Sequence, residues 1–112
     1  MSAATYNFNL DQGADFALEL VMKEEGVVKD LTGYSARAQI RKSKEAATPA
    51  ASFNCTIPAP TDGKIKIEMS NSVSVDIPAG IYYYDLEIYT SSDVIVLRLL
   101  QGQVTVTREI TR

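Results

Sequence analysis

The fold of this chain is decided by the stretch Ile81-Tyr-Tyr-Tyr-Asp-Leu-Glu-Ile-Tyr89. Successive side chains of a β-strand point to opposite faces, and this stretch alternates between two kinds of face. The more apolar face holds Tyr82, Tyr84, Leu86 and Ile88, and the other face holds Tyr83, Asp85, Glu87 and Tyr89. We therefore predict a strand that buries the first face in the core and turns the second face outward.

The residues that enter this strand, Ala79-Gly-Ile-Tyr82, resemble the tyrosine corner of immunoglobulin-like folds. In that corner, a tyrosine hydroxyl near the start of a late strand hydrogen-bonds to the backbone a few residues upstream. The resemblance implies that Tyr82 fixes the point at which the chain crosses from one sheet to the other.

The same period of two recurs along most of the chain. It predicts strands over residues 6–10, 34–41, 51–57, 64–69, 94–101 and 104–107. Turn-forming residues separate these segments at intervals of about ten residues, which is typical of a β-sandwich. With 112 residues, of which 46% are apolar, the chain is suited to one core. We predict an all-β fold, an immunoglobulin-like antiparallel β-sandwich of about seven to eight strands in a single domain over residues 1–112.

The segment Phe16-Ala-Leu-Glu-Leu-Val-Met-Lys-Glu-Glu25 is compatible with either a helix or a strand. It consists largely of good helix formers and ends at Gly26, as a helix often does. Its apolar residues also alternate cleanly, which indicates a strand. We favour the strand because the surrounding segments are β. Farther along, residues 70–77 have room for one helical turn with Val73 and Ile77 on one side.

Charge and composition narrow the possible partners. The net charge is −3 and no basic run occurs, so we expect no nucleic acid partner. The start of the sequence lacks the features of a signal peptide, and the apolar stretch 94–100 is interrupted by Arg98 and too short to span a bilayer. We expect no membrane partner and a protein of the cytosolic type.

Catalytic chemistry has little support in these residues. The chain contains no histidine and a single cysteine, Cys55, which we interpret as a small buried apolar residue. Asp85, Glu87 and Glu68 fall on outward strand faces, where charge is ordinary, so we do not assign them acid–base roles. The turn-associated aspartates are Asp11, Asp15, Asp30 and Asp62. Calcium binding is conceivable there, but turn formation explains them better. We expect no enzyme, no cofactor and no metal.

Two surfaces are candidates for binding. The first is formed by Tyr83 and Tyr89, whose rings suit protein interfaces and sugar platforms alike. Packing within the fold is the alternative for these rings.

The second surface lies along residues 94–100, which are apolar on both faces. If Val94 and Val96 face the core, then Ile95, Leu97 and Leu99 point outward. Strict alternation would turn Arg98 inward, so a bulge near Gly102 is expected to reset the register. A subunit or partner interface and internal coverage by another element both explain the apolar outer face.

Four blocks of the sequence resemble a family of small tailed-phage proteins. These blocks are Tyr6-Asn-Phe-Asn-Leu-Asp-Gln-Gly-Ala-Asp-Phe16, Asp30-Leu-Thr-Gly-Tyr-Ser-Ala-Arg-Ala-Gln-Ile-Arg41, Pro78-Ala-Gly-Ile-Tyr-Tyr-Tyr-Asp-Leu-Glu87 and Leu99-Leu-Gln-Gly-Gln-Val-Thr-Val-Thr-Arg-Glu-Ile-Thr-Arg112. They are also similar to the N-terminal domain of phage baseplate upper proteins, which attaches receptor-binding machinery to the tail. The resemblance covers nearly the whole chain and implies an immunoglobulin-like sandwich with a structural, non-enzymatic role.

The expected function follows from this resemblance. The sequence ends after the predicted sandwich, without the long C-terminal extension of a baseplate upper protein, so we expect a stand-alone tail, baseplate or fibre adaptor. Its partners would be other virion proteins and further copies of itself, and its location would be the virion, assembled in the host cytoplasm. The alternatives are a capsid decoration protein and, from another class, a carbohydrate-binding module with Tyr83 and Tyr89 as stacking platforms.

Overall fold

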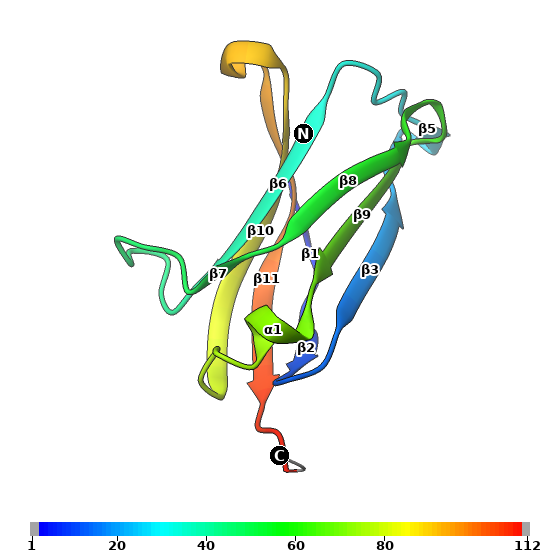
Figure 1. Cartoon of the computed structure of the whole chain (residues 1–112). Coiled ribbons are helices and arrows are strands. Elements are labelled where there is room, and N and C mark those ends of the chain that lie inside the picture. The colour runs from blue at the N-terminus through cyan, green and yellow to red at the C-terminus, as the bar shows by residue number, and fades with distance from the viewer. Residues whose placement is uncertain (1–2, 111–112) are drawn as a thin grey trace.

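The computed structural model describes residues 3–110 and confirms an all-β fold in which two sheets stack face to face (Figure 1). The larger sheet contains, in order, β1 (Ala4–Thr5), β11 (Val96–Thr107), β10 (Gly80–Tyr89), β6 (Ser35–Arg41) and β7 (Ala51–Ser52), and β2 (Phe8–Asp11) also pairs with β11. The smaller sheet contains β3 (Phe16–Val21), β9 (Lys64–Met69) and β8 (Asn54–Ala59). The remaining elements are the hairpin β4 (Lys23–Glu24) and β5 (Val27–Val28), and the short helices η1 (Pro60–Asp62), α1 (Asn71–Ser74) and η2 (Ser91–Asp93).

The strand order is that of an immunoglobulin-like sandwich, with one departure. The sheets β3-β9-β8 and β6-β10-β11 correspond to strands B-E-D and C-F-G of that fold. In the constant-type fold, the first strand, A, pairs with strand B. Here β1 and β2 pair instead with β11, in parallel, so the sandwich is not wholly antiparallel as the sequence predicted.

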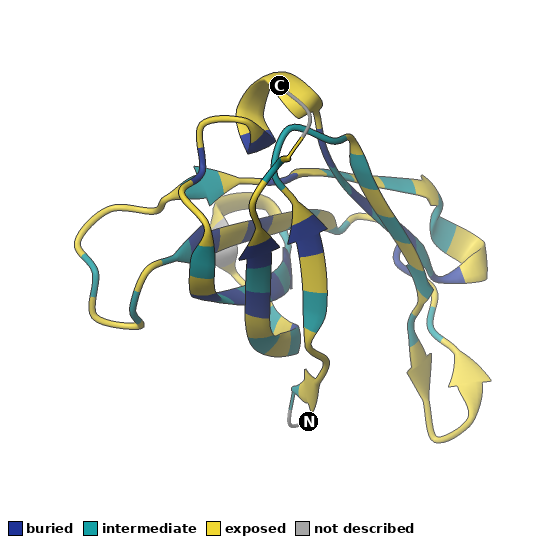
Figure 2. Ribbon diagram, turned by 90° about the horizontal axis from the view of Figure 1, so that it is seen from below, coloured by how far each residue is buried: buried dark blue, intermediate teal, exposed yellow. Residues whose placement is uncertain are grey.

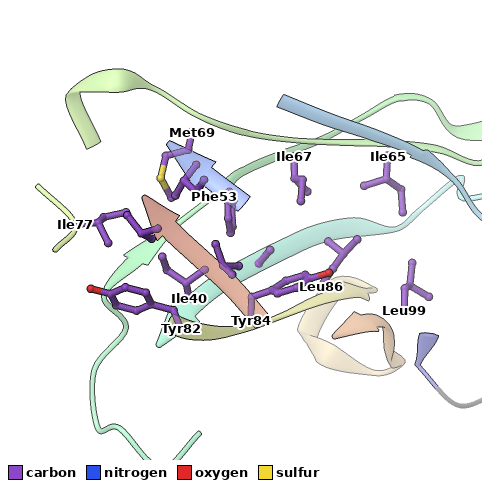
Figure 3. Packing of buried hydrophobic residues seen from close by; sticks show 14 of the residues in the cluster. Ile40, Phe53, Ile65, Ile67, Met69, Ile77, Tyr82, Tyr84, Leu86 and Leu99 are labelled. Carbon is purple, nitrogen blue, oxygen red and sulfur yellow. The ribbon is translucent and has the colours of Figure 1, made fainter. Parts of the chain in front are cut away.

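The core lies between the sheets and is filled by the faces that alternation selected (Figures 2 and 3). The buried residues of β10 are Tyr82, Tyr84, Leu86 and Ile88, as expected. Facing them across the sandwich are Ile65, Ile67 and Met69 of β9. In β10, the period of two therefore predicted which side chains are buried.

The tyrosine corner is confirmed. The Tyr82 hydroxyl donates a hydrogen bond of 2.7 Å to the Pro78 carbonyl oxygen, four residues upstream. The bond closes where the chain leaves α1 and enters β10, so it fixes the crossing from the smaller to the larger sheet. A second hydroxyl, that of Tyr84, donates to the Tyr6 carbonyl at 2.6 Å and attaches the N-terminal segment to the core.

Residues 16–21 form the strand that we favoured. Leu18 and Leu20 lie opposite Ile67 and Ile65 of β9, so the segment satisfies its backbone in a sheet and packs its apolar face on the core. Tertiary pairing thus outweighs the helix propensity of these residues.

Of the N-terminal strand predicted over residues 6–10, only residues 8–10 belong to a strand, β2, while residues 6 and 7 separate it from β1. Gly102 of β11 approaches the Tyr6 backbone so closely that a Cβ atom there would lie 2.3 Å from the Tyr6 carbonyl oxygen. The Asn7 side chain accepts a hydrogen bond from the Gln103 amide at 2.9 Å, in place of a regular ladder. As a result Tyr6 is exposed instead of facing the core, while Leu10 is buried as predicted.

The helical turn expected within residues 70–77 exists as α1, but its orientation differs from the prediction. Val73 is exposed, and Ser74 is buried beside Ile77. The Ser74 hydroxyl accepts a hydrogen bond from the Gly13 amide (3.1 Å) and donates one to the Ala14 carbonyl (2.8 Å). These two bonds hold α1 against the turn between β2 and β3, and they decide which side of the helix is buried. Within residues 3–110, no helix has the length and apolar character to cross a membrane.

Candidate binding surfaces

The predicted interface along residues 94–100 is divided by a β-bulge. Leu86 of β10 pairs with Leu100, but the next residue, Glu87, pairs with Arg98, so Leu99 is the extra residue. The bulge expected near Gly102 therefore occurs at Leu99. It turns Arg98 outward, where its Nε lies 3.2 Å from Asp85 Oδ2.

The bulge reverses the orientation predicted for two candidate interface residues. Leu99 is only 5% exposed, and Leu97 packs against the core, so the outward orientation predicted for both was wrong. Val94 and Val96, which we expected to face the core, are exposed, Val94 by 79%. Ile95, 44% exposed, remains outward. Sequence alternation could not place the extra residue, because both faces of this segment are apolar.

Three consecutive exposed apolar residues lie at the end of the loop between β10 and β11, which we call the tip. The tip consists of Val94, Ile95 and Val96, and Val96 lies beside Tyr89 in the sheet. Two hydrogen bonds join Thr90 and Ile95. The Thr90 amide donates to the Ile95 carbonyl, and the Ile95 amide donates to the Thr90 hydroxyl, both at 2.9 Å. These bonds hold the tip in a defined shape.

Tyr83 and Tyr89 both lie on the outward face of β10 and are half-buried, but they do not form one platform. They are six residues apart on an extended strand, which separates them by about 20 Å. Each ring faces a cation: the Arg37 guanidinium lies 4.3 Å from the Tyr89 centroid, and Lys44 Nζ lies 5.7 Å from the Tyr83 centroid. The two tyrosines thus belong to separate surfaces.

Two clefts flank Tyr83 on the outer face of the larger sheet. One, of about 240 Å³, is lined by Gln39, Arg41, Lys44, Tyr83, Tyr84, Asp85, Arg98 and Gln101. The other, of about 300 Å³, is lined by Thr5, Asn7, Lys44, Tyr83, Gln101, Gly102 and Gln103. Because they share three residues, we treat them as one groove, the Tyr83 groove. Within it, burial raises the pKa of Asp85, as does the neighbouring Glu87 carboxylate, while nearby arginines act in the opposite direction.

A second groove, which is apolar and lies where β3 forms the edge of the smaller sheet, was not anticipated from the sequence. It runs between β1 and the free edge of β3, and its central part, of about 420 Å³, is lined by Ala4, Thr5, Tyr6, Leu18, Leu20 and Leu100. Beyond Ala4 it continues into a hollow of about 870 Å³ that includes Met22, Glu24, Glu25 and Val27. We call the whole the β3-edge groove. Leu18 and Leu20 are only partly buried, because β1 pairs with β11 and leaves their outer side uncovered.

The cysteine and several of the aspartates that were considered for catalysis or metal binding have surroundings that explain them without such a role. Burial raises the pKa of the Cys55 thiol to about 11, which keeps it protonated at neutral pH. Asp30 accepts hydrogen bonds from the Thr32 amide and hydroxyl, which lowers its pKa. Asp15 accepts from the Asn71 amide, and Asp11 accepts from the Thr107 hydroxyl. Among the described side chains, no cluster of three or more potential metal ligands occurs.

Comparison with known proteins shows likeness of shape without close sequence relatives. No protein-family model matches the chain, and no curated protein matches it. Among solved structures, InlP of Listeria monocytogenes is similar over 94% of this chain and 28% of its own, with a TM-score of 0.49 and 10% identity. A family 123 glycoside hydrolase from Clostridium perfringens is similar over 96% of this chain and 24% of its own, with a TM-score of 0.46 and 11% identity. The chain thus spans about a quarter of the length of each.

Proposed function

We propose that this chain is a non-enzymatic structural protein of a tailed-phage virion, an adaptor in the tail, baseplate or fibre that binds neighbouring virion proteins. The observation that carries the proposal is the free backbone edge of β3 beside an apolar groove (Figure 1). The resemblance of the four sequence blocks to tailed-phage proteins supports the location. Capsid decoration, the alternative, would use the same surface.

A free strand edge binds extended segments through its unpaired amide and carbonyl groups. β3 is six residues long, and among the strands of residues 3–110 only β9 pairs with it. β3 corresponds to strand B, and in the constant-type immunoglobulin fold strand A pairs with that edge. A strand added to β3 would therefore complete the four-stranded sheet of that fold. An added strand would also cover Leu18 and Leu20, so backbone pairing and apolar burial act together.

The groove also indicates the chemistry of the segment that fills it. Its central part is apolar, so every second side chain of the partner should be apolar. At the far end, the lining includes Lys23, Glu25 and Glu24, and the Glu24 carboxylate pairs with Lys29 Nζ at 3.4 Å. The partner we infer is therefore an extended segment of a neighbouring virion protein in which apolar residues alternate with polar ones.

The location is tested on the phage particles whose genome encodes the chain. We expect a labelled copy to appear at the tail end in negative-stain images. Label on the head shell would support decoration in place of the adaptor role. Particles that carry no label would contradict both assignments.

The binding edge is tested with Ala4→Arg, which places a long charged side chain in the groove without removing a core contact, since Ala4 is exposed. We expect incorporation into particles to fall by about tenfold or more. The matched control is Ala47→Arg in the exposed loop 42–50, which should incorporate normally. Equal incorporation of both variants would rule out the β3 edge as the docking site.

A further inference from the structure

The Tyr83 groove lies on the outer face of the larger sheet, and the strand register defines its floor. Tyr83 lies between Arg41 and Gln103, and the next outward residue, Asp85, lies between Gln39 and Gln101. The floor of the groove therefore carries an aromatic ring, a carboxylate and side-chain amides, which are spaced as neighbouring residues of a β-sheet are. Loop residue Lys44 contributes to both clefts, next to the Tyr83 ring.

Positive charge exceeds negative charge in this groove, although the whole chain carries −3. Arg98 is neutralised by Asp85 at 3.2 Å. Arg41 donates to the Ala46 carbonyl at 2.9 Å and to Gln39 Oε1 at 3.1 Å, which positions the guanidinium beside the cleft. Among the described side chains, no carboxylate lies within ion-pair distance of Lys44 or Arg41. An anionic ligand is therefore favoured over a neutral or cationic one.

The hydrogen-bonding groups of the groove suit a ligand with many hydroxyls. Each glutamine amide offers both donors and an acceptor, which matches neighbouring hydroxyls that also donate and accept. Gln101 and Gln103 are exposed, so these groups are open to a ligand. The half-buried Tyr83 ring adds an apolar surface for the C–H face of a sugar.

A peptide is less suited to this surface. β10, which forms the floor, is paired on both sides with β11 and β6 from residue 83 to residue 89, so no free backbone edge is available for strand addition. Side chains alone must then recognise the ligand.

We propose that the Tyr83 groove binds a carboxylated carbohydrate, a chain that contains uronic acid units. Lys44 and Arg41 hold the carboxylate, the amides of Gln101 and Gln103 bind hydroxyl groups, and the Tyr83 ring contacts the sugar face. The Tyr83 groove and the β3-edge groove both reach Thr5, but their proposed roles fall on different residues, Lys44 and Gln101 in the first and the edge of β3 in the second, so the two proposals are tested separately.

The test measures the binding affinity of the purified chain for oligogalacturonate and oligomannuronate by titration. Dextran serves as the neutral sugar control, and poly-glutamate serves as the acidic peptide control. We expect binding to one or both uronate oligomers that weakens with salt, and no binding to dextran. Lys44→Glu should weaken uronate binding by about tenfold or more, because it replaces a charge-assisted hydrogen bond with repulsion. Gln101→Ala should weaken it less, while circular dichroism stays unchanged.

The matched control is Lys64→Glu, which makes the same change of charge on the smaller sheet and should bind as the parent chain does. Several outcomes would overturn the proposal. These are no binding of either uronate, equal binding of dextran, binding of poly-glutamate alone, or equal loss in Lys44→Glu and Lys64→Glu. None of these outcomes bears on the β3 edge, which is tested with Ala4→Arg.

Discussion

At the scale of single residues, two tyrosine hydroxyls connect the core to backbone carbonyl groups of other segments. Tyr82 anchors the crossing into β10, and Tyr84 anchors the chain at Tyr6. Both rings are buried, so each hydroxyl satisfies a polar group where water has little access. The alternation of the sequence predicted their burial, and the corner motif predicted the bond of Tyr82. The bond of Tyr84 joins residues far apart in sequence and could not be predicted from spacing.

Tyr82→Phe should lower the free energy of unfolding by about 1–2 kcal/mol, because it leaves the Pro78 carbonyl without its partner. Urea denaturation measures the change. Tyr89→Phe is the control: its hydroxyl makes no hydrogen bond among the described residues, and we expect a change below about 0.5 kcal/mol. Equal losses in the two variants would show that the corner bond does not stabilise the fold.

Tyr84 should make stability depend on pH in the alkaline range. Burial raises the pKa of Tyr84 to about 12, and the nearby Tyr6 contributes in the same direction. The unfolded chain loses this proton near pH 10, so the stabilising contribution is complete below pH 10 and is lost as pH rises toward 12. Tyr84→Phe should therefore show a smaller fall in the free energy of unfolding between these pH values. Parallel curves for the two proteins would contradict this assignment.

At the scale of elements, the bulge in β11 decides which apolar residues belong to the core. One extra residue, Leu99, lies between the pairs Leu86–Leu100 and Glu87–Arg98. Because of this residue, the alternation of inward and outward side chains before the bulge is out of step with the alternation after it. The partly polar pattern of β10 was sufficient to predict its two faces. The uniformly apolar pattern of 94–100 was not, because it fits either register equally well.

Leu99→Ala should lower the free energy of unfolding by about 2–4 kcal/mol, since it removes a buried side chain and leaves a cavity. Val96→Ala on the exposed face should change it by less than about 0.5 kcal/mol. Thermal or urea unfolding distinguishes the two. The opposite order of effects would restore the register that the sequence alone predicted.

At the scale of the whole molecule, the sandwich measures 42 × 27 × 25 Å and presents separate surfaces in different directions. The β3-edge groove lies along one side, the Tyr83 groove on the outer face of the larger sheet, and the tip at the loop between β10 and β11. This separation allows one small domain to contact several neighbours at once, as an adaptor must. Self-association, predicted from the sequence, has the exposed tip as its best candidate surface.

Light scattering of the purified chain should report a dimer or larger symmetric assembly. Ile95→Asp places a charge on the tip and should shift the chain toward a monomer, because burial of that charge would be unfavourable. Ile110→Asp is the control, since Ile110 is also exposed but lies outside the tip. A parent chain that stays monomeric at high concentration would disprove self-association.

The sequence by itself determined the class of fold, the two faces of β10 and the corner at Tyr82, because each depends on a period of two or on neighbours a few residues apart. Only the tertiary structure decided the bulge at Leu99, the free edge of β3 and the meeting of Lys44 with Tyr83. These features depend on which strand pairs with which, and pairing brings together residues whose separation along the chain carries no periodic signal.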